Sequence, residues 1–287
     1  MAGRLTETLL DTPLAEALAG PPAATFSLAW LGQAGFVIEL AGRRLVIDPY
    51  LSDSLAVKYR GTARPHRRMM PAPVEPEALG RVDAVLCTHA HTDHMDPATL
   101  QPLLSANPGA NLVVPRAVLA QSALRAGRAE AEITPVDAGE SVEILPGITL
   151  TATRAAHETL EEDEAGRHRF LGYALQAGPI RLWHSGDCVP FDGLVAEVRA
   201  LAPDLVLLPV NGRRPELSDN GVPGNFSLTE AIDLAQAVGA TSMIAHHYGL
   251  FDFNTADPRE IDERIGTCGA LQLLRARTGR LYGWTLS

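Results

Sequence analysis

Lysine is nearly absent from this sequence: Lys58 is the only one, and arginine supplies the other positive charges. The 34 acidic residues outnumber the 24 basic ones, which leaves a formal net charge of −10. An acidic chain of this kind has no general electrostatic attraction for nucleic acid or for an anionic membrane. We therefore expect neither as a partner.

Cysteine is also scarce. Three widely spaced cysteines, an odd number, argue against a disulfide framework and against a cysteine-based zinc site. No stretch approaches the ~20 consecutive apolar residues of a transmembrane helix. The first residues lack the basic start and apolar core of a secretory signal peptide. These absences favour a reducing, cytoplasmic location.

The amino-terminal residues 1–20 mix leucines with acidic residues, which predicts an amphipathic helical segment. Pro13 divides it, and Pro21-Pro22 ends it. Its apolar face could pack on its own domain or on a second subunit, so a homo-oligomer stays open.

Beyond this segment, short apolar strands alternate with helices, as a layered α/β domain requires. The expected strands cover residues 25–31, 35–40, 44–47, 82–87, 112–114, 142–144, 148–154, 170–177, 180–184, 205–210 and 242–246. The expected helices begin at Pro97, cover 116–126 and 191–201, and run from the capping box at 227–230 to Gly239. No linker or repeat interrupts the pattern, so residues 1–287 are predicted to form a single domain.

The most informative segment is residues 88–96, Thr-His-Ala-His-Thr-Asp-His-Met-Asp. It lies between a buried strand and a capped helix start, where α/β folds place their sites. Imidazole and carboxylate bind zinc, manganese or iron. His89 and His91 share one face of an extended chain and can hold one ion. Asp93 and His94 follow at the turn, where they can reach a second ion, whereas Asp96 is better explained as the helix cap.

Three more candidate ligands follow other predicted strands: His157, Asp187 and His247. One histidine or aspartate at a strand end is more often a surface or capping residue. Together, however, these three supply what a two-metal site still needs. Cys188 beside Asp187 is better explained as a small buried residue than as a ligand. His184 is expected to support the turn that carries Asp187.

The motif His89-x-His91-x-Asp93-His94 is similar to the signature of the metallo-β-lactamase superfamily, and the resemblance covers nearly the whole chain. Residues 30–36 (Trp-Leu-Gly-Gln-Ala-Gly-Phe), 47–51, 184–187, 209–213 and 247–248 resemble the branch that includes L-ascorbate-6-phosphate lactonase. The resemblance implies an α/β fold of four layers, an αββα sandwich, with the site at the mouth between its sheets.

The resemblance also implies roles for the candidate residues, with two divalent ions, zinc or manganese. The first ion would be bound by His89, His91 and His157, and the second by Asp93, His94 and His247. Asp187 would bridge the two ions. Asp48 would support the metal-binding loop without binding metal. The family pattern puts its histidine directly before a tyrosine, which selects His247 over His246. His246 is then a packed or hydrogen-bonded histidine.

We therefore expect a hydrolase in which a metal-bound hydroxide attacks a small anionic substrate, such as a phosphorylated sugar lactone. Asp93 would also accept or relay the proton. The expected substrate-binding residues are Asn211, Arg213 and Tyr248, and the loops 157–169 and 211–225 could cover the mouth.

Three alternatives remain: a phosphodiesterase of the same superfamily, a diiron redox protein, and a non-catalytic metal-binding protein. The acidic charge and the absence of an RNA-binding arm argue against the first. Redox members carry a flavin domain and a glutamate at the position of His91, and this chain has neither. The apparently complete set of ligands argues against a non-catalytic metal-binding protein.

Overall fold

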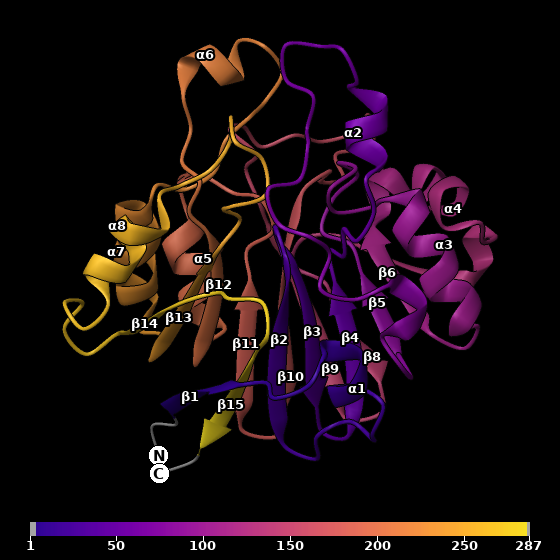
Figure 1. Cartoon of the computed structure of the whole chain (residues 1–287), viewed down its shortest axis with the longest axis horizontal. Coiled ribbons are helices and arrows are strands. Elements are labelled where there is room, and N and C mark those ends of the chain that lie inside the picture. Colours follow the sequence, from indigo (N-terminus) through magenta and orange to yellow (C-terminus); the bar gives the residue numbers. More distant parts are fainter. Residues whose placement is uncertain (1–3, 286–287) are drawn as a thin grey trace.

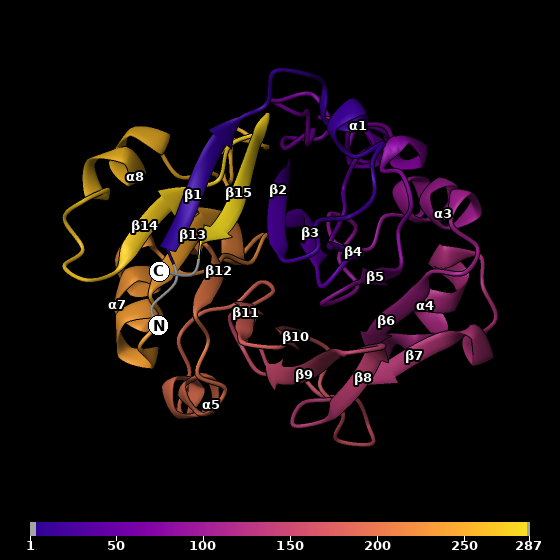
Figure 2. The same ribbon diagram turned by 90° about the horizontal axis from the view of Figure 1, so that it is seen from below.

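The structure is a computed structural model that describes residues 4–285, and its backbone forms two β-sheets that pack face to face (Figures 1 and 2). The first sheet has eight strands in the order β1 (Arg4–Leu9), β15 (Arg280–Thr285), β2 (Phe26–Gly32), β3 (Gly35–Leu40), β4 (Arg43–Ile47), β5 (Ala84–Leu86), β6 (Asn111–Pro115) and β7 (Ile133–Val136). The second sheet has seven, in the order β14 (Gln272–Arg275), β13 (Ser242–His246), β12 (Leu205–Pro209), β11 (Ile180–His184), β10 (Leu171–Ala177), β9 (Ile148–Arg154) and β8 (Ser141–Leu145).

Helices cover the outer face of each sheet, which gives the four αββα layers expected from the sequence (Figure 2). The first sheet is covered by α1 (Leu14–Ala17), α3 (Pro97–Ala106) and α4 (Leu119–Ala126). The second is covered by α5 (Leu194–Ala200), α7 (Leu228–Val238) and α8 (Pro258–Arg264). Two short helices, α2 (Ser54–Lys58) and α6 (Pro215–Ser218), stand above the sheets (Figure 1). Three 3₁₀ turns cover Pro76–Ala78, Arg116–Val118 and Glu130–Glu132.

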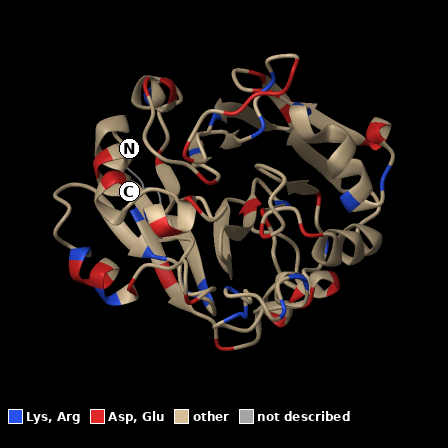
Figure 3. Cartoon of the chain, turned by 90° about the horizontal axis from the view of Figure 1, so that it is seen from above, with Lys and Arg blue, Asp and Glu red and all other residues tan. Residues whose placement is uncertain are grey.

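Strand β2 shows why the first sheet is apolar on both faces. Leu28 and Trp30 point into the core between the sheets, whereas Ala29 and Leu31 belong to the cluster beneath α3. Alternate side chains of a strand point to opposite faces, so a strand in the middle of a layered fold is apolar throughout. Charged residues accordingly gather on the outer helices and on loops (Figure 3).

The parallel strands bring their carboxyl ends to one edge of the sandwich. Strand β4 runs parallel to β5, and β11, β12 and β13 run parallel to one another. The segments that follow β4, β5, β11 and β13 therefore emerge at the same end of the molecule. This is the end on which α2 and α6 stand (Figure 1).

The amino-terminal segment differs from the expected helix. Residues Arg4–Leu9 form strand β1, which pairs antiparallel with β15, and only Leu14–Ala17 are helical. Residues 1–3 of the expected helical segment lie outside the described residues. The partner strand lies at the other end of the chain, and its pairing satisfies the backbone of β1 while Leu5 becomes buried. Helical spacing of leucines could not reveal such a distant partner.

Gln272 of β14 joins the two sheets at this edge. Its side-chain amide donates to the carbonyl oxygen of Leu5 at 2.9 Å and accepts from the Leu5 amide at 3.0 Å. Strand β1 is thus bonded to β15 on one side and to a side chain of the opposite sheet on the other. Within residues 4–285, no helix is long and apolar enough to cross a membrane.

Candidate metal centre

Seven side chains of ligand type meet at the carboxyl-end edge of the sandwich. Residues 89–94 follow β5, Asp187 follows β11, and His247 follows β13. His157 comes shortly after β9, an antiparallel neighbour of β10. Both sheets therefore contribute side chains to one place, the mouth between the sheets where the resemblance put the site.

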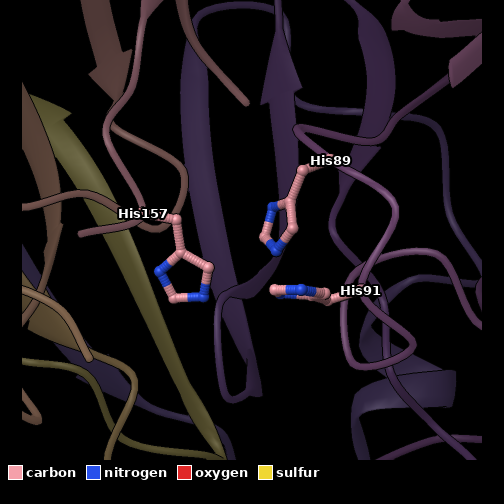
Figure 4. Close-up of side chains that lie close together, drawn as sticks. All are labelled: His89, His91 and His157. Atoms are coloured by element: carbon pink, nitrogen blue, oxygen red, sulfur yellow. The ribbon is translucent and has the colours of Figure 1, made fainter. Parts of the chain in front are cut away.

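The first group consists of His89, His91 and His157. One ring nitrogen of each lies within 4.8 Å of the others. His89 and His91 come from the same loop, and His157 faces them from the other sheet (Figure 4). His89 and His157 are buried. Three imidazoles at this spacing suit a single metal ion.

The second group consists of Asp93, His94 and His247, whose ligand atoms also lie within 4.8 Å of one another. Asp187 lies between the two groups. Its Oδ2 is 3.3 Å from His94 Nε2, 3.2 Å from His247 Nε2 and 3.7 Å from His157 Nε2. One carboxylate oxygen thus approaches imidazoles of both groups, which is the position a bridging ligand needs.

The donor atoms of this centre fit a cation. His89 Nε2, His94 Nε2, His247 Nε2 and Asp187 Oδ1 are buried and have no hydrogen-bond partner in the protein. Unpartnered buried polar atoms are costly, and a bound ion would remove that cost. Burial lowers the pKa of His89 well below its usual value and that of His157 to about 4. Both imidazoles are therefore neutral, the form that binds metal.

Asp48 orients ligands of both groups. It follows β4, is fully buried and adopts a left-handed backbone conformation with φ of 44°. Its Oδ2 accepts from His94 Nδ1 at 2.8 Å and from the Thr88 hydroxyl at 2.6 Å, and its Oδ1 accepts from the Thr88 amide at 2.8 Å. Thr88 Oγ1 in turn lies 3.0 Å from His89 Nδ1. Asp48 therefore turns Nε2 of both histidines toward the centre, the supporting role that the resemblance implied.

His184 and His246 lie behind the centre. His184 Nε2 is 2.9 Å from the Ala34 carbonyl oxygen, and its Nδ1 accepts from the Gly186 amide at 3.0 Å, which fixes the turn that carries Asp187. The buried ring of His246 stacks on His184, with 4.9 Å between ring centroids. His247 is separated from His246 by a break in the strand, because its φ is 62°. This break, more than strand alternation, turns His247 toward the other candidate ligands.

Asp96 and Cys188 are the two residues that the sequence analysis considered as ligands and then explained in another way. Asp96 caps α3, with its Oδ1 accepting from the Ala98 amide. Cys188 is buried in the core between the sheets. Neither belongs to the groups of possible ligands among the described residues.

Gln33 is a site residue to which the sequence analysis gave no role. Its Nε2 donates to Asp93 Oδ2 at 2.8 Å, and its backbone carbonyl accepts from the His247 amide at 2.9 Å. Its Oε1 is buried and has no hydrogen-bond partner in the protein. The residue has φ of 50°, an uncommon conformation for a side chain of this size. The only available signal was its place in the β2–β3 turn of the motif 30–36.

The three expected substrate-binding residues are engaged elsewhere. Arg213 forms an ion pair with Glu230 at 2.7 Å. The Tyr248 ring stacks on Trp30, and its buried hydroxyl donates to the Ala276 carbonyl oxygen. The side chain of Asn211 bonds to Asn225 and Asn254. None of the three lines the pocket at the metal centre. Arg213 does lie near a strand end, but Glu230 of the capping box pairs with its guanidinium.

A pocket of about 190 Å³ opens onto the centre. Its walls include the turn at Gln33, the loop 221–223, five candidate ligands and four aromatic side chains: His91, Asp93, His157, Asp187 and His247, with Tyr59, His66, Phe251 and Phe253. A larger open cavity of about 1,040 Å³ lies beside it, but no possible metal ligand of either group lines it. The smaller pocket is therefore the candidate reaction site.

The two loops suspected of covering the mouth are tied together. Glu158 accepts hydrogen bonds from the Gly224 amide, at 2.9 Å, and from the Ser218 hydroxyl. Arg64, in the segment after α2, donates to the Glu216 carbonyl oxygen of α6 at 3.0 Å. Three loops that are distant in sequence therefore hold one another above the site.

Comparisons with known proteins show the family and the fold. Residues 43–248 match the family model described as Beta-lactamase superfamily domain. The chain is 28% identical over 247 residues to a UPF0173 metal-dependent hydrolase of Thermoplasma acidophilum, covering 86% of this chain and 94% of the relative. A relative of the same description from Pyrobaculum aerophilum is 25% identical over 240 residues, covering 83% of this chain and 91% of the relative. Among solved structures, isothiocyanate hydrolase from Delia radicum gut bacteria superimposes with a TM-score of 0.70 and 20% identity, covering 89% of this chain and 97% of that one.

Proposed function

Because this chain belongs to the β-lactamase superfamily, we propose that it is a metal-dependent hydrolase with a two-metal centre that acts on a small anionic ester, such as a lactone. The observation that carries the proposal is the position of Asp187 Oδ2, within 3.7 Å of imidazoles from both ligand groups. The printed description of the relatives as metal-dependent hydrolases supports the reaction class.

Two divalent ions bound at such a centre supply an activated water and polarise the carbonyl under attack. His89, His91 and His157 would hold one ion, and Asp93, His94 and His247 the other, with Asp187 between them. The protein's own contribution is the orientation of these ligands. Asp48 fixes two imidazoles, and Gln33 fixes the carboxylate of Asp93.

Asp93 is placed for proton transfer as well as for metal binding. Its carboxylate lines the pocket, whereas His89 and His94 lie deeper. We assign to Asp93 the proton of the attacking water, because a general base must lie within hydrogen-bond reach of the proton it takes. Gln33 donates to Asp93 Oδ2 and so stabilises the carboxylate in one orientation.

Metal analysis of the purified protein tests the centre directly. We expect close to two ions per chain at saturation with zinc or manganese, and loss of activity on chelation. A reproducible ceiling of one ion with full activity would exclude the bridging role of Asp187.

A panel of substrates tests the reaction. Phosphorylated sugar lactones, neutral lactones and phosphodiesters would be assayed with the zinc and manganese forms. Faster turnover of anionic lactones supports the proposal, and a preference for phosphodiesters would replace it with the phosphodiesterase alternative.

A further inference from the structure

Aromatic rings form one side of the pocket at the metal centre. Tyr59 and His66 stack on each other, with 4.2 Å between their centroids. The edge of His66 meets Phe251 at 5.1 Å and Phe253 at 4.7 Å, and the two phenylalanine rings are nearly parallel. All four rings line the pocket. Because two of them come from the segment after α2 and two from the loop after β13, the wall joins two distant parts of the chain.

The wall is held in a fixed arrangement. Phe251 is buried in a small apolar cluster with Tyr50 and Leu55, and Phe253 packs partly exposed against that cluster. His66 Nδ1 donates to the Arg64 carbonyl oxygen at 2.6 Å. A preorganised flat apolar surface favours a ligand that is itself flat, because little ordering is needed on binding.

Apart from Tyr59 and the possible metal ligands, the ionisable residues of the pocket are basic. They are Lys58, His66 and Arg125, whereas the only carboxylates are Asp93 and Asp187. The Lys58 ammonium lies 4.9 Å from the centre of the Tyr59 ring and forms no ion pair with any described residue. Arg125 donates only to the carbonyl oxygens of Ala90 and Met95, which leaves its charge uncompensated by a carboxylate in contact with it. An otherwise acidic protein thus keeps positive charge free at this rim.

We propose that the substrate carries a flat apolar group beside an anionic group, with the flat group against Phe253 and the anion at Lys58. The proposal rests on the proposed hydrolase function and names its substrate class: aromatic or otherwise planar esters and lactones bearing a carboxylate, sulfonate or phosphate. The cavity of about 190 Å³ is smaller than the ~300–1,000 Å³ of sites for drug-sized ligands, so the substrate has one ring, not several.

Three matched probes test recognition of the flat group and of the anionic group separately, and none of them needs to be hydrolysed. They are 4-methylbenzenesulfonate, which has ring and charge, 4-methylbenzyl alcohol, which has the ring alone, and hexanesulfonate, which has the charge alone. Dissociation constants for the metal-loaded protein would come from ligand-observed NMR titrations. We expect the first probe to bind at least about tenfold more tightly than either of the others.

Variants assign each preference to a residue. Lys58→Gln should weaken both sulfonates by about 5–20-fold and leave the alcohol unchanged, and added salt should reduce the difference. Phe253→Leu should weaken the two aromatic probes and spare hexanesulfonate. Arg60→Gln is the control: it removes a charge two residues from Lys58, from a side chain that lines the larger cavity and not this pocket.

Equal binding of all three probes by the wild type would overturn the proposal, as would equal losses in Lys58→Gln and Arg60→Gln. The expected binding pattern without hydrolysis of any ester would keep the subsite and refute the hydrolase. Hydrolysis of esters without the expected binding pattern would support the hydrolase and refute the subsite.

Discussion

His246 and His247 are neighbours in sequence but occupy different environments. His246 ends β13 and packs on His184 and Phe36 in the core, whereas Nε2 of His247 lies 3.2 Å from Asp187 Oδ2. The left-handed backbone at His247 separates them. Substitutions at these two adjacent positions can therefore separate the effect of losing a candidate metal ligand from the effect of losing a core side chain.

We expect His247→Ala to lose one of the two ions and His246→Ala to retain both. His246→Ala should instead lower the Tm, because it opens a cavity in the core. Metal quantification and thermal melts of both variants check this. Greater metal loss in a folded His246→Ala protein would reverse the assignment.

Asp48→Ala should lower metal affinity by roughly 10–100-fold, because His94 loses its orienting acceptor. The measurement is competition with a chelator of known affinity. Asp83→Ala is the matched control, since Asp83 is a largely buried carboxylate paired with Arg43 and Arg81 and does not contact the centre. Similar losses of affinity in both variants would point to general destabilisation.

Gln33→Leu should reduce kcat by about tenfold through loss of the hydrogen bond to Asp93. The Gln33 carbonyl that accepts from His247 is part of the backbone and remains, so metal content should change little. Steady-state kinetics with metal analysis distinguishes the two effects. An unchanged kcat would remove Gln33 from the positioning of Asp93.

At the scale of elements, strands with local signals were predictable and strands that depend on distant partners were not. β3, β9, β11 and β13 match their predicted ranges, because each has a local pattern of apolar residues, which in β9 alternate with polar ones. β7 escaped prediction because Pro135 lies within it, and an edge strand tolerates proline. Helix α8 did carry a recognisable signal, since Asp257-Pro258 repeats the cap and first-turn proline of Asp96-Pro97.

The candidate site also has a part with a local sequence signal and a part without one. The meeting of the candidate ligands could be expected, because histidines and aspartates at the ends of parallel strands lie at one edge of a sheet. The pocket wall was not, because His66, Phe251 and Phe253 converge only through two irregular loops. Arg213 illustrates the limit: its nearest acid, Glu230, lies 17 positions away on α7.

Glu158→Ala should loosen the loop 211–225 by removing its tether to α6 and Gly224. We expect the Gly224 amide to exchange with solvent roughly tenfold faster, while amides in α7 keep their protection. Hydrogen exchange read by NMR or mass spectrometry checks this. Glu164→Ala, an exposed acid in the same loop as Glu158, is the control, and an equal effect there would show that the tether is unimportant.

At the scale of the whole molecule, one edge of the sandwich depends on residues from both ends of the chain. β15 lies between β1 and β2, and Gln272 bonds to both backbone groups of Leu5. The two sheets are therefore joined there by a side chain as well as by the shared core.

Gln272→Leu should lower the free energy of unfolding by about 1–3 kcal/mol, since two hydrogen bonds are lost and the Leu5 backbone groups lose their partners. The Tm should fall by several degrees. Gln176→Leu, at an exposed position of β10, serves as the control. Equal melting curves for the two variants would show that the Gln272 bridge adds nothing to stability.

The single lysine has a practical consequence for the molecule as a whole. Lys58 carries the only side-chain amine of the chain, and it lies at the rim of the pocket beside Tyr59. Amine-selective chemistry such as reductive methylation or coupling of an activated ester would thus modify one side chain and no other. A fluorophore attached there would report ligand entry in real time, and a ¹³C-methyl label would give one NMR signal from the pocket without any mutation.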